Sequence, residues 1–472
     1  MGAHAVSGAE LSRRAGRLRA ESKWIPPAGA MVLKSEPCAA SRDQNAPYAG
    51  VLWSFWRNLK AHPLARVGPG LITGAADDDP SGIGTYSQAG AQFGLNMLWT
   101  IPLAYPLMAA VQSMCGRIGR VTGQGLAANI KTAFPPSVLN VVVLLLLIAN
   151  TLNIAADIAA MGEVGELVSG FDRRAMAIGF VLTTLLLQIF VPYRRYVVFL
   201  KWLTVSLLAY AAVLFTVHVP WGEVARRTVW PHLELNSTTA AMIVAVFGTT
   251  ISPYLFFWQA SEEVEDMRKE QAVSLREDPA AAPRELRRIQ WDTWSGMFYS
   301  DITAYFIILA TAVTLNVAGV TNVDTAAQAA SALRPLAGDF AFILFAFGIV
   351  GVGLIGVPVL AASAAYALAE AMSWKEGLER KATDARGFYA VIAVSVLAGL
   401  LIQYSPISPM RALFLSAVIN GVVAVPLLVV IILLASKRSV MGAYTSTRSI
   451  VILGWIATLV MGLATLLMFV PR

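Results

Sequence analysis

Long apolar stretches separated by short polar segments dominate the chain after residue 48. Each stretch is close to the roughly 20 residues that a helix needs to cross about 30 Å of hydrocarbon. The pattern predicts an all-α integral membrane protein with about eleven transmembrane helices. The expected spans are residues 67–91, 95–116, 137–160, 175–192, 197–219, 238–260, 296–317, 338–371, 387–403, 409–435 and 450–470.

The first 48 residues differ from the rest, because basic residues stand there among Ala, Gly, Ser and Pro without a sustained apolar block. We expect a disordered basic tail over residues 1–48 and a transmembrane transporter domain over residues 49–472. The tail has no apolar core followed by a small-residue cleavage site, so it does not read as a signal peptide. The first spanning helix should therefore act as the insertion signal.

Composition excludes several classes of protein. The chain is 57% hydrophobic and only 14% charged, which is far from the balance of a soluble domain. Its net charge of +7 does not indicate nucleic-acid binding, because the Lys and Arg residues lie in the tail and in short loops. Two cysteines are too few for a disulfide framework. With no nucleotide-binding loop and no His-x-x-x-His run, we expect neither an enzyme nor a bound cofactor.

The distribution of basic residues predicts the orientation in the membrane. Basic residues follow the even-numbered spans, so these loops should lie on the same side as the basic tail. We expect a multi-pass protein of the inner (plasma) membrane with a cytoplasmic N-terminus and the C-terminus on the opposite side. The largest hydrophilic loop, residues 261–295, falls on the cytoplasmic side and begins with Glu262, Glu263 and Glu265. These glutamates suit either a solvated face or an acidic funnel for cations.

Two spans are chemically interrupted, the first and the sixth. The first contains Asp77-Asp78-Asp79-Pro80, and the sixth contains Thr249-Thr250-Ile251-Ser252-Pro253. Proline removes a backbone donor, and three adjacent carboxyl groups are costly in hydrocarbon. Breaks at the first and sixth of eleven spans indicate a 5+5 inverted repeat. The first repeat should cover about residues 64–219 and the second about 238–435, with an extra helix at 450–470.

Broken helices at mid-membrane indicate a cation site. Their freed carbonyl groups can coordinate a cation, and Asp79 adds a formal charge. At least one of the three aspartates should face the transport pathway, because carboxylates inside membranes are expensive. A polar lip without a ligand is the alternative, and for Asp77 and Asp78 individually the two interpretations are equally good.

Five short runs of residues carry more specific information. They are Gly68-Pro69-Gly70 with Asp79-Pro80-Ser81-Gly82 and Gln88-Ala89-Gly90-Ala91-Gln92-Phe93-Gly94, then Gly248-Thr249-Thr250-Ile251-Ser252-Pro253-Tyr254, and Ala155-Ala156-Asp157. They resemble the NRAMP family of metal transporters, whose signatures are Asp-Pro-Gly-Asn, Gln-Ala-Gly-Ala-Gln-Phe-Gly and Gly-Ala-Thr-Val-Met-Pro-His. The resemblance implies a LeuT-like fold that carries divalent metal ions at a site between the first and sixth helices.

The departures from the family pattern bear on the ion. Asp79 falls on the family's metal-binding aspartate, whereas Gly82 takes its asparagine position and Ser252 its methionine position. We expect a site built from Asp79, Ser252, backbone carbonyls and water, with Gly82, Thr249 and Asp78 beside them. Hard oxygen donors suit Mg²⁺ or Mn²⁺, and selectivity for softer metals should be weak. The pattern is similar to the NRAMP-related magnesium transporters, and the choice among Mn²⁺, Fe²⁺ and Mg²⁺ stays open.

Further departures from the family pattern concern proton coupling. Tyr254 and Gln259 stand where the family has histidines, and Ala160 stands where it has an acidic residue. Asp157 remains as a proton acceptor, unless it is paired within the bundle, and Tyr254 and Asp77 are further candidates on the proton or ion pathway. Transport should be weakly coupled or uncoupled.

Amide side chains form a further polar set inside the spans. Asn420 and Gln259 are candidate pathway residues, whereas Asn150 and Asn153 should make helix-to-helix hydrogen bonds. The divalent ion and the lipid bilayer are the partners we expect, with protons as a candidate second ion. Oligomeric state is not determined by the sequence.

Two other classes of function can be weighed against a metal transporter. A symporter of a small organic solute such as an amino acid could use the same fold, but it needs a half-helix N-terminus free to meet a carboxylate. Three aspartates beside the break argue against that. A membrane sensor or membrane-embedded enzyme lacks support, because the chain has neither catalytic motifs nor an appended soluble domain.

Overall fold

The structure is a computed structural model that describes residues 73–74, 76–191, 200, 205–232, 234 and 236–470. The expected tail over residues 1–48 and parts of the first and fifth predicted spans lie outside these residues. The described residues form helices connected by turns and loops, without β-strands. The prediction of an all-α membrane protein is confirmed.

Seven helical segments of the described chain are long and apolar enough to cross a membrane. Three of them unite consecutive elements, namely α11 with α12, α13 with the short helices at its ends, and α16 with the two short helices that precede it. Their main helices are α6 (Pro136–Ser169), α7 (Arg173–Phe190), α11 (Ser237–Thr250), α12 (Pro253–Lys269), α13 (Ala282–Thr311), α16 (Ala341–Met372), α18 (Pro409–Ser436) and α20 (Arg448–Met468).

The remaining predicted spans also coincide with helices, although they do not all reach spanning length within the described residues. Helix α3 (Pro80–Phe93) continues into η2 (Gly94–Met97), which meets α4 (Thr100–Thr122) at 111°. This bent pair counts as one further span at most by length and composition, whereas the hydropathy pattern predicts two spans there. Helix α17 (Arg386–Gly399) is apolar but short, and α9 (Leu208–Val213) belongs to the partly described fifth span.

Short helices lie in the connections between the spans. The α-helices among them are α5 (Leu126–Ala133), α10 (Trp221–Val229), α14 (Ala326–Ser331), α15 (Arg334–Ala337) and α19 (Arg438–Met441). The 3₁₀ segments are η3 (Val205–Leu207), η4 (Pro279–Ala281), η6 (Gly338–Phe340) and η7 (Leu400–Tyr404), and η5 (Ala312–Asn316) is a π-helical turn that ends α13.

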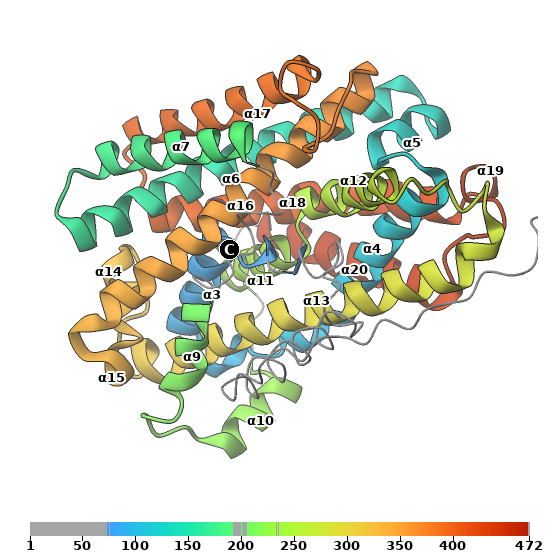
Figure 1. The fold of residues 1–472 in the computed structure, drawn as a ribbon. Helices are drawn as coiled ribbons and strands as arrows, with labels where there is room; N and C mark the ends of the chain where they lie inside the picture. Colours follow the sequence, from blue (N-terminus) through green and yellow to red (C-terminus); the bar gives the residue numbers. More distant parts are fainter. Residues whose placement is uncertain are drawn as a thin grey trace, which may run out of the picture. The chain divides into compact units, whose positions relative to one another are not determined.

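Elements from both halves of the sequence pack together around the two interrupted spans. Helix α6 packs against α16, α18 and α7, while α3 packs against α13, α18 and α11 (Figure 1). The small residues of α16 permit close approach, since a Cβ on Gly356 would lie 3.1 Å from the Asp79 Cβ. The first and sixth spans are thereby enclosed by helices drawn from residues far apart in the chain.

Three basic loops meet at one end of the bundle. The Lys131 ammonium donates to the carbonyl of Ala371, and the Lys437 ammonium donates to the carbonyl of Ala133. The Arg117 guanidinium donates to the Thr445 carbonyl. These contacts join the loops that follow the second, eighth and tenth spans, which are the loops that the charge pattern assigns to one side.

Candidate metal site

The first predicted break lies at Asp78 and Asp79. Residues 73, 74, 76 and 77 are helical, Asp78 and Asp79 are not, and α3 begins at Pro80. Pro80 suits the first helical position because its missing N–H would have no partner there. Asp79 is the N-cap, and its Oδ1 accepts a 2.8 Å hydrogen bond from the Gly82 backbone N–H. The sequence-predicted interruption of the first span is confirmed.

The second predicted break is also present. Helix α11 ends at Thr250 and α12 begins at Pro253, with Ile251 (φ −99°, ψ 61°) and Ser252 (φ −80°, ψ 133°) outside helical geometry. The two breaks lie against each other. The Tyr254 hydroxyl donates to the Ala76 carbonyl at 3.0 Å. The interruptions are therefore parts of one site.

The two carboxylate oxygens of Asp79 have different surroundings. Oδ1 accepts from the Gly82 N–H and from the Ser81 hydroxyl at 2.7 Å, so it is held by the first turn of α3. Oδ2 faces other helices: the Asn153 amide donates to it from α6 at 2.9 Å, and the Tyr254 hydroxyl of α12 lies 3.4 Å away. Oδ2 is thus the oxygen that can be offered to an ion.

Asp79 is a buried charge without a basic partner. Only 1% of the residue is exposed, and no Lys or Arg pairs with it among the described residues. Isolated carboxylates are strongly disfavoured in a low-dielectric interior unless they are paired or coordinate metals. The arrangement therefore provides a negative site that a cation would neutralise.

Hydroxyl oxygens from both breaks border this carboxylate. The Thr249 Oγ1 lies 3.4 Å from the Ser81 Oγ, which itself donates to Asp79. The Ser252 hydroxyl lies within hydrogen-bond distance of the Gly248 and Thr249 carbonyls, at 2.8 and 2.6 Å. Thr249 is therefore connected to Asp79 through Ser81, whereas Ser252 is bonded to the end of its own half-helix.

Gly82 contributes backbone only. A Cβ there would lie 3.3 Å from the Tyr86 ring and 3.4 Å from the Thr249 hydroxyl. Position 82 thus has little free space beside α11. The asparagine that the family pattern places there has no side-chain counterpart at this position.

Helix α6 brings two polar side chains to the Asp79 region. Asn153 contacts Asp79 directly, and Asp157, one turn further along α6, is buried with both carboxylate oxygens unpartnered among the described residues. The sequence predicts Asp157 on the ion pathway and predicts only a helix-to-helix contact for Asn153. Asn153 lies four residues before Asp157, so both side chains share one face of α6. This spacing is the sequence signal that indicates a position for Asn153 near the site.

Asp77 and Asp78 point toward α13 rather than toward α6. The Ser300 hydroxyl lies 2.5 Å from the Asp77 Oδ2 and 3.0 Å from the Asp78 Oδ1, and it can donate its single proton to one of them at a time. Asp301 is buried beside them, and neither of its carboxylate oxygens has a hydrogen-bond partner among the described residues. The three adjacent aspartates are therefore divided between two neighbourhoods.

Carboxylates alone do not form a chelating cluster. Within the described residues no group of three or more His, Cys, Asp or Glu side chains could hold a metal ion together. An ion at Asp79 would need oxygen atoms from hydroxyl, amide or backbone groups as its other ligands. Such mixed oxygen sets are ordinary for Mg²⁺ and Mn²⁺.

The two remaining predicted pathway residues, Gln259 and Asn420, lie on different spans. Gln259 is buried on α12, where its Oε1 accepts a 2.6 Å hydrogen bond from the Thr73 hydroxyl. Asn420 is buried on α18, and both of its amide atoms lack a partner among the described residues. It directly precedes Gly421, which packs on α11. Gln259 thus joins the first and sixth spans, and Asn420 presents free polar atoms in the interior.

The glutamates at the end of α12 are not a solvated face. Glu263 is fully buried and forms an ion pair with Arg288 of α13, and Glu265 accepts a 3.0 Å hydrogen bond from the Tyr366 hydroxyl. Arg288 also pairs with Glu285, which in turn pairs with the buried Arg120 of α4. The solvated interpretation is wrong for these residues, because both are buried, Glu263 against Arg288 of α13 and Glu265 against Tyr366 of α16.

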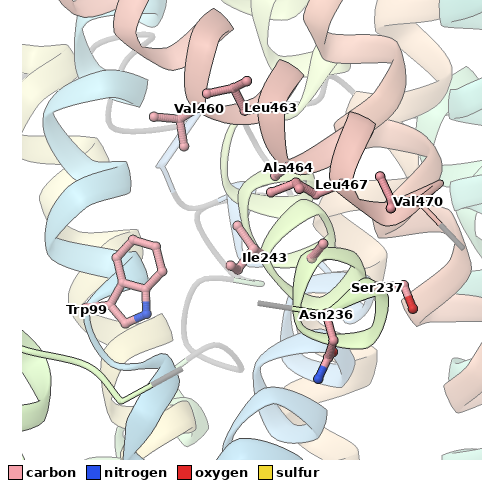
Figure 2. A pocket seen from close by; sticks show the side chains of 10 residues that line it. Trp99, Asn236, Ser237, Ile243, Val460, Leu463, Ala464, Leu467 and Val470 are labelled. Atoms are coloured by element: carbon pink, nitrogen blue, oxygen red, sulfur yellow. The ribbon is translucent and has the colours of Figure 1, made fainter. Parts of the chain in front are cut away.

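The structure also contains an apolar cavity of about 380 Å³ apart from this site. Figure 2 shows Trp99 on one side and Val460, Leu463 and Leu467 of α20 on the other, with Ile243 of α11 between them. Asn236 and Ser237 are polar members of its lining. None of the predicted site residues borders this cavity.

Comparisons with known proteins found related sequences. The family model described as "Nramp: Natural resistance-associated macrophage protein-like" matches residues 70–471. The chain is 26% identical to "Divalent metal cation transporter MntH" of Acidiphilium cryptum over 426 residues, covering 87% of this chain and 89% of that protein. It is 25% identical to the protein of the same name from Klebsiella pneumoniae (strain 342), covering 83% and 91%.

Solved structures show the same fold. The Eremococcus coleocola manganese transporter, crystallised with an aromatic bis-isothiourea substituted compound, aligns with a TM-score of 0.68 at 16% identity, covering 88% of this chain and 87% of that one. Mhp1, a nucleobase-cation-symport-1 family transporter, aligns with a TM-score of 0.54 at 14% identity, covering 85% and 92%. These likenesses concern the fold alone.

Proposed function

Because the chain belongs to the Nramp family and is a membrane transporter of divalent metal cations, we propose that it carries its ion on the Asp79 carboxylate, between the breaks in the first and sixth spans. The single observation that supports this most is the pair of different environments at Asp79. Its Oδ1 is fixed by α3, and its Oδ2 faces α6 and α12 in a buried region without a basic partner. A dication placed there would neutralise a charge that is otherwise expensive to bury.

The donor atoms around Asp79 suggest the class of ion. Besides the carboxylate, the two breaks offer the hydroxyls of Ser81, Thr249 and Ser252 and nearby backbone carbonyls. All are hard oxygen donors, which favour Mn²⁺, Fe²⁺ or Mg²⁺ over softer metals. The manganese transporter of Eremococcus coleocola has the same fold. We propose Mn²⁺ and Mg²⁺ as the ions to test first.

Transport is proposed to run across the cytoplasmic membrane into the cell by alternating access. The basic loops that meet through Lys131, Lys437 and Arg117 would face the cytoplasm, as the excess of basic residues in cytoplasmic loops requires. With this orientation the N-terminus is cytoplasmic and the C-terminus is on the other side. Movement of the two repeats against each other would expose the ion to each side in turn.

A symporter of an organic solute on the same fold is less well supported. Such a protein would use the free N-terminus of a half-helix to bind a carboxylate of its substrate. Here the N-terminus of α3 is already capped by the Asp79 side chain, and α12 begins at Pro253, which has no N–H to donate. Both half-helix N-termini are poorly suited to an anionic group.

The decisive experiment is metal uptake into proteoliposomes that contain the wild-type protein or Asp79→Asn. The substitution removes the charge but keeps an acceptable N-cap, so α3 should persist while Mn²⁺ and Mg²⁺ flux is lost. Asp172→Asn is the matched control, because Asp172 also caps a helix, α7, but is exposed. Undiminished flux in Asp79→Asn would reject the carboxylate as the ion ligand.

A further inference from the structure

Helix α6 carries two asparagines that differ in what they contact. Both Asn150 and Asn153 are completely buried, and they lie three residues apart. The Asn150 amide donates to the Leu360 carbonyl and to the Ser363 hydroxyl of α16, so it joins two helices. The Asn153 amide instead donates to the Asp79 Oδ2. One of the two therefore belongs to helix packing and the other to the candidate metal site.

The amide oxygen of Asn153 is left free at this site. Its Nδ2 donates to Asp79, while its Oδ1 is buried and has no hydrogen-bond partner among the described residues. Buried polar atoms in proteins are almost always satisfied. The Asn150 Oδ1 also lacks a partner among the described residues, so the feature that distinguishes Asn153 is the buried Asp79 carboxylate beside its free oxygen, where one ligand could contact both groups. A bound cation would satisfy the oxygen and the carboxylate together.

Position 82 explains why an amide from another helix would be needed at the site. The family pattern has an amide ligand one turn into α3, where this chain has Gly82, and no side chain can project from there. The Asn153 amide reaches the same carboxylate from a different helix, 74 residues further along the chain. An amide oxygen can thus be supplied to the ion from α6 instead of from α3.

We propose that Asn153 is a direct ligand of the transported ion and replaces the amide that position 82 lacks. The inference rests on the proposed ion site at Asp79. Rotation of the amide about its terminal torsion would exchange the positions of Nδ2 and Oδ1 without moving α6. Without the ion, the N–H of Asn153 stabilises the Asp79 carboxylate; with the ion bound, the oxygen of the same side chain joins Asp79 in its coordination.

A soft ligand placed at position 153 tests this directly. In Asn153→Cys a thiol replaces the amide, and thiolates favour Cd²⁺ over Mn²⁺. The ratio of Cd²⁺ to Mn²⁺ affinity, measured by calorimetry on the purified full chain, should rise roughly tenfold or more if residue 153 touches the ion. Asn150→Cys is the matched control and should leave the ratio at the wild-type value, because its side chain faces α16.

The outcomes separate this inference from the proposed function. If Asp79→Asn abolishes Mn²⁺ binding but Asn153→Cys leaves the Cd²⁺ to Mn²⁺ ratio unchanged, Asn153 is only a hydrogen-bond partner and the inference is overturned. If Asp79→Asn binds Mn²⁺ normally, the site itself is misplaced and the proposed function fails first. The inference and the proposed function are both supported if the Cd²⁺ to Mn²⁺ ratio rises in Asn153→Cys but not in Asn150→Cys, and Asp79→Asn loses Mn²⁺ binding.

A second substitution covers the case in which Asn153→Cys does not fold. Asn153→Asp keeps the shape and adds a carboxylate beside Asp79, so it should lower thermal stability without metal and restore it when Mn²⁺ is added. A purely structural hydrogen bond predicts the loss of stability without this rescue. Asn150→Asp should show no Mn²⁺ rescue, because no ion lies beside it in this arrangement.

Discussion

Gly248 of α11 and Gly421 of α18 bring the backbones of two helices into direct contact. A Cβ added to Gly421 would lie 3.3 Å from the Gly248 Cα and 2.5 Å from the Val244 carbonyl oxygen. The contact lies immediately before the break at Ile251 and Ser252. It fixes the end of α11, whose last residues include the Thr249 hydroxyl.

Gly248→Ala should therefore disturb both stability and transport. The added methyl would clash with the Ala417 carbonyl and the Gly421 backbone N. Overpacking of this kind costs about 1–3 kcal/mol. We expect a lower unfolding temperature in detergent and reduced Mn²⁺ uptake. Gly179→Ala on α7 is the control, because a Cβ there meets nothing within 4 Å; equal behaviour of the two variants would contradict the packing argument.

Ser252→Met should make the site softer. A thioether in place of a hydroxyl favours Cd²⁺ over Mn²⁺ and Mg²⁺. The affinity ratio of Cd²⁺ to Mn²⁺ should rise about tenfold in calorimetry, since a softer donor changes selectivity more than overall affinity. Ser295→Met, at an exposed position of α13, should leave the ratio unchanged. A wild-type ratio in Ser252→Met would place residue 252 outside the coordination sphere.

The two breaks could be predicted from the sequence because their causes are local. Pro80 and Pro253 each remove a backbone donor inside an apolar stretch, and Asp79 is a good N-cap for the helix that follows. Helix boundaries of this kind depend on a few neighbouring residues. The position of Asp79 at the start of α3 follows from that chemistry alone.

The role of Asn153 could not be predicted in the same way. Its target, Asp79, lies 74 residues away, and the choice between Asp79 and a carbonyl of another helix depends on the rotation of α6 in the bundle. Asn150 has the same side chain in the same span and makes the expected helix-to-helix bond. Local sequence does not distinguish the two, because tertiary packing decides which amide faces the break.

The burial of Glu263 escaped prediction for a related reason. Glutamates at the end of a span are usually solvated, and the ion-pair partner Arg288 belongs to the next helix, beyond a long hydrophilic loop. Only the fold brings α12, α13 and α4 together at this point. The segment 261–295 therefore reads as a hydrophilic loop in the sequence, because only the tertiary structure shows which of its charged residues are paired and buried.

Arg288→Met should destabilise the protein by leaving Glu263 buried without its partner. Arg288 is 33% exposed, so part of the pair's interaction is screened, and the expected loss is roughly 2 kcal/mol. Adding Glu263→Gln to the same chain should recover much of this loss. Thermal unfolding in detergent measures both effects. Arg284→Met, four residues earlier and 84% exposed, should have little effect; a similar loss there would show that the charge itself, not the pair, matters.

Mn²⁺ uptake should proceed without equivalent acidification of proteoliposomes. Tyr254 and Gln259 occupy positions where the family resemblance places histidines. The Gln259 Oε1 accepts from the Thr73 hydroxyl, and the Tyr254 hydroxyl donates to the Ala76 carbonyl and lies 3.4 Å from the Asp79 Oδ2. Neither titrates near neutral pH. A pH-sensitive dye inside the vesicles, recorded together with Mn²⁺ entry, tests the prediction. Acidification in proportion to Mn²⁺ entry would show that Asp157 or another carboxyl group carries protons instead.

The unequal use of the two Asp79 oxygens has a consequence for turnover. One oxygen closes the first turn of α3, and the other reaches across to neighbouring helices. An ion can leave the second oxygen while the first keeps the half-helix intact, so an unloaded protein does not have to rebuild its binding surface before the next cycle. The return step is then limited by the movement of helices and not by refolding of the site.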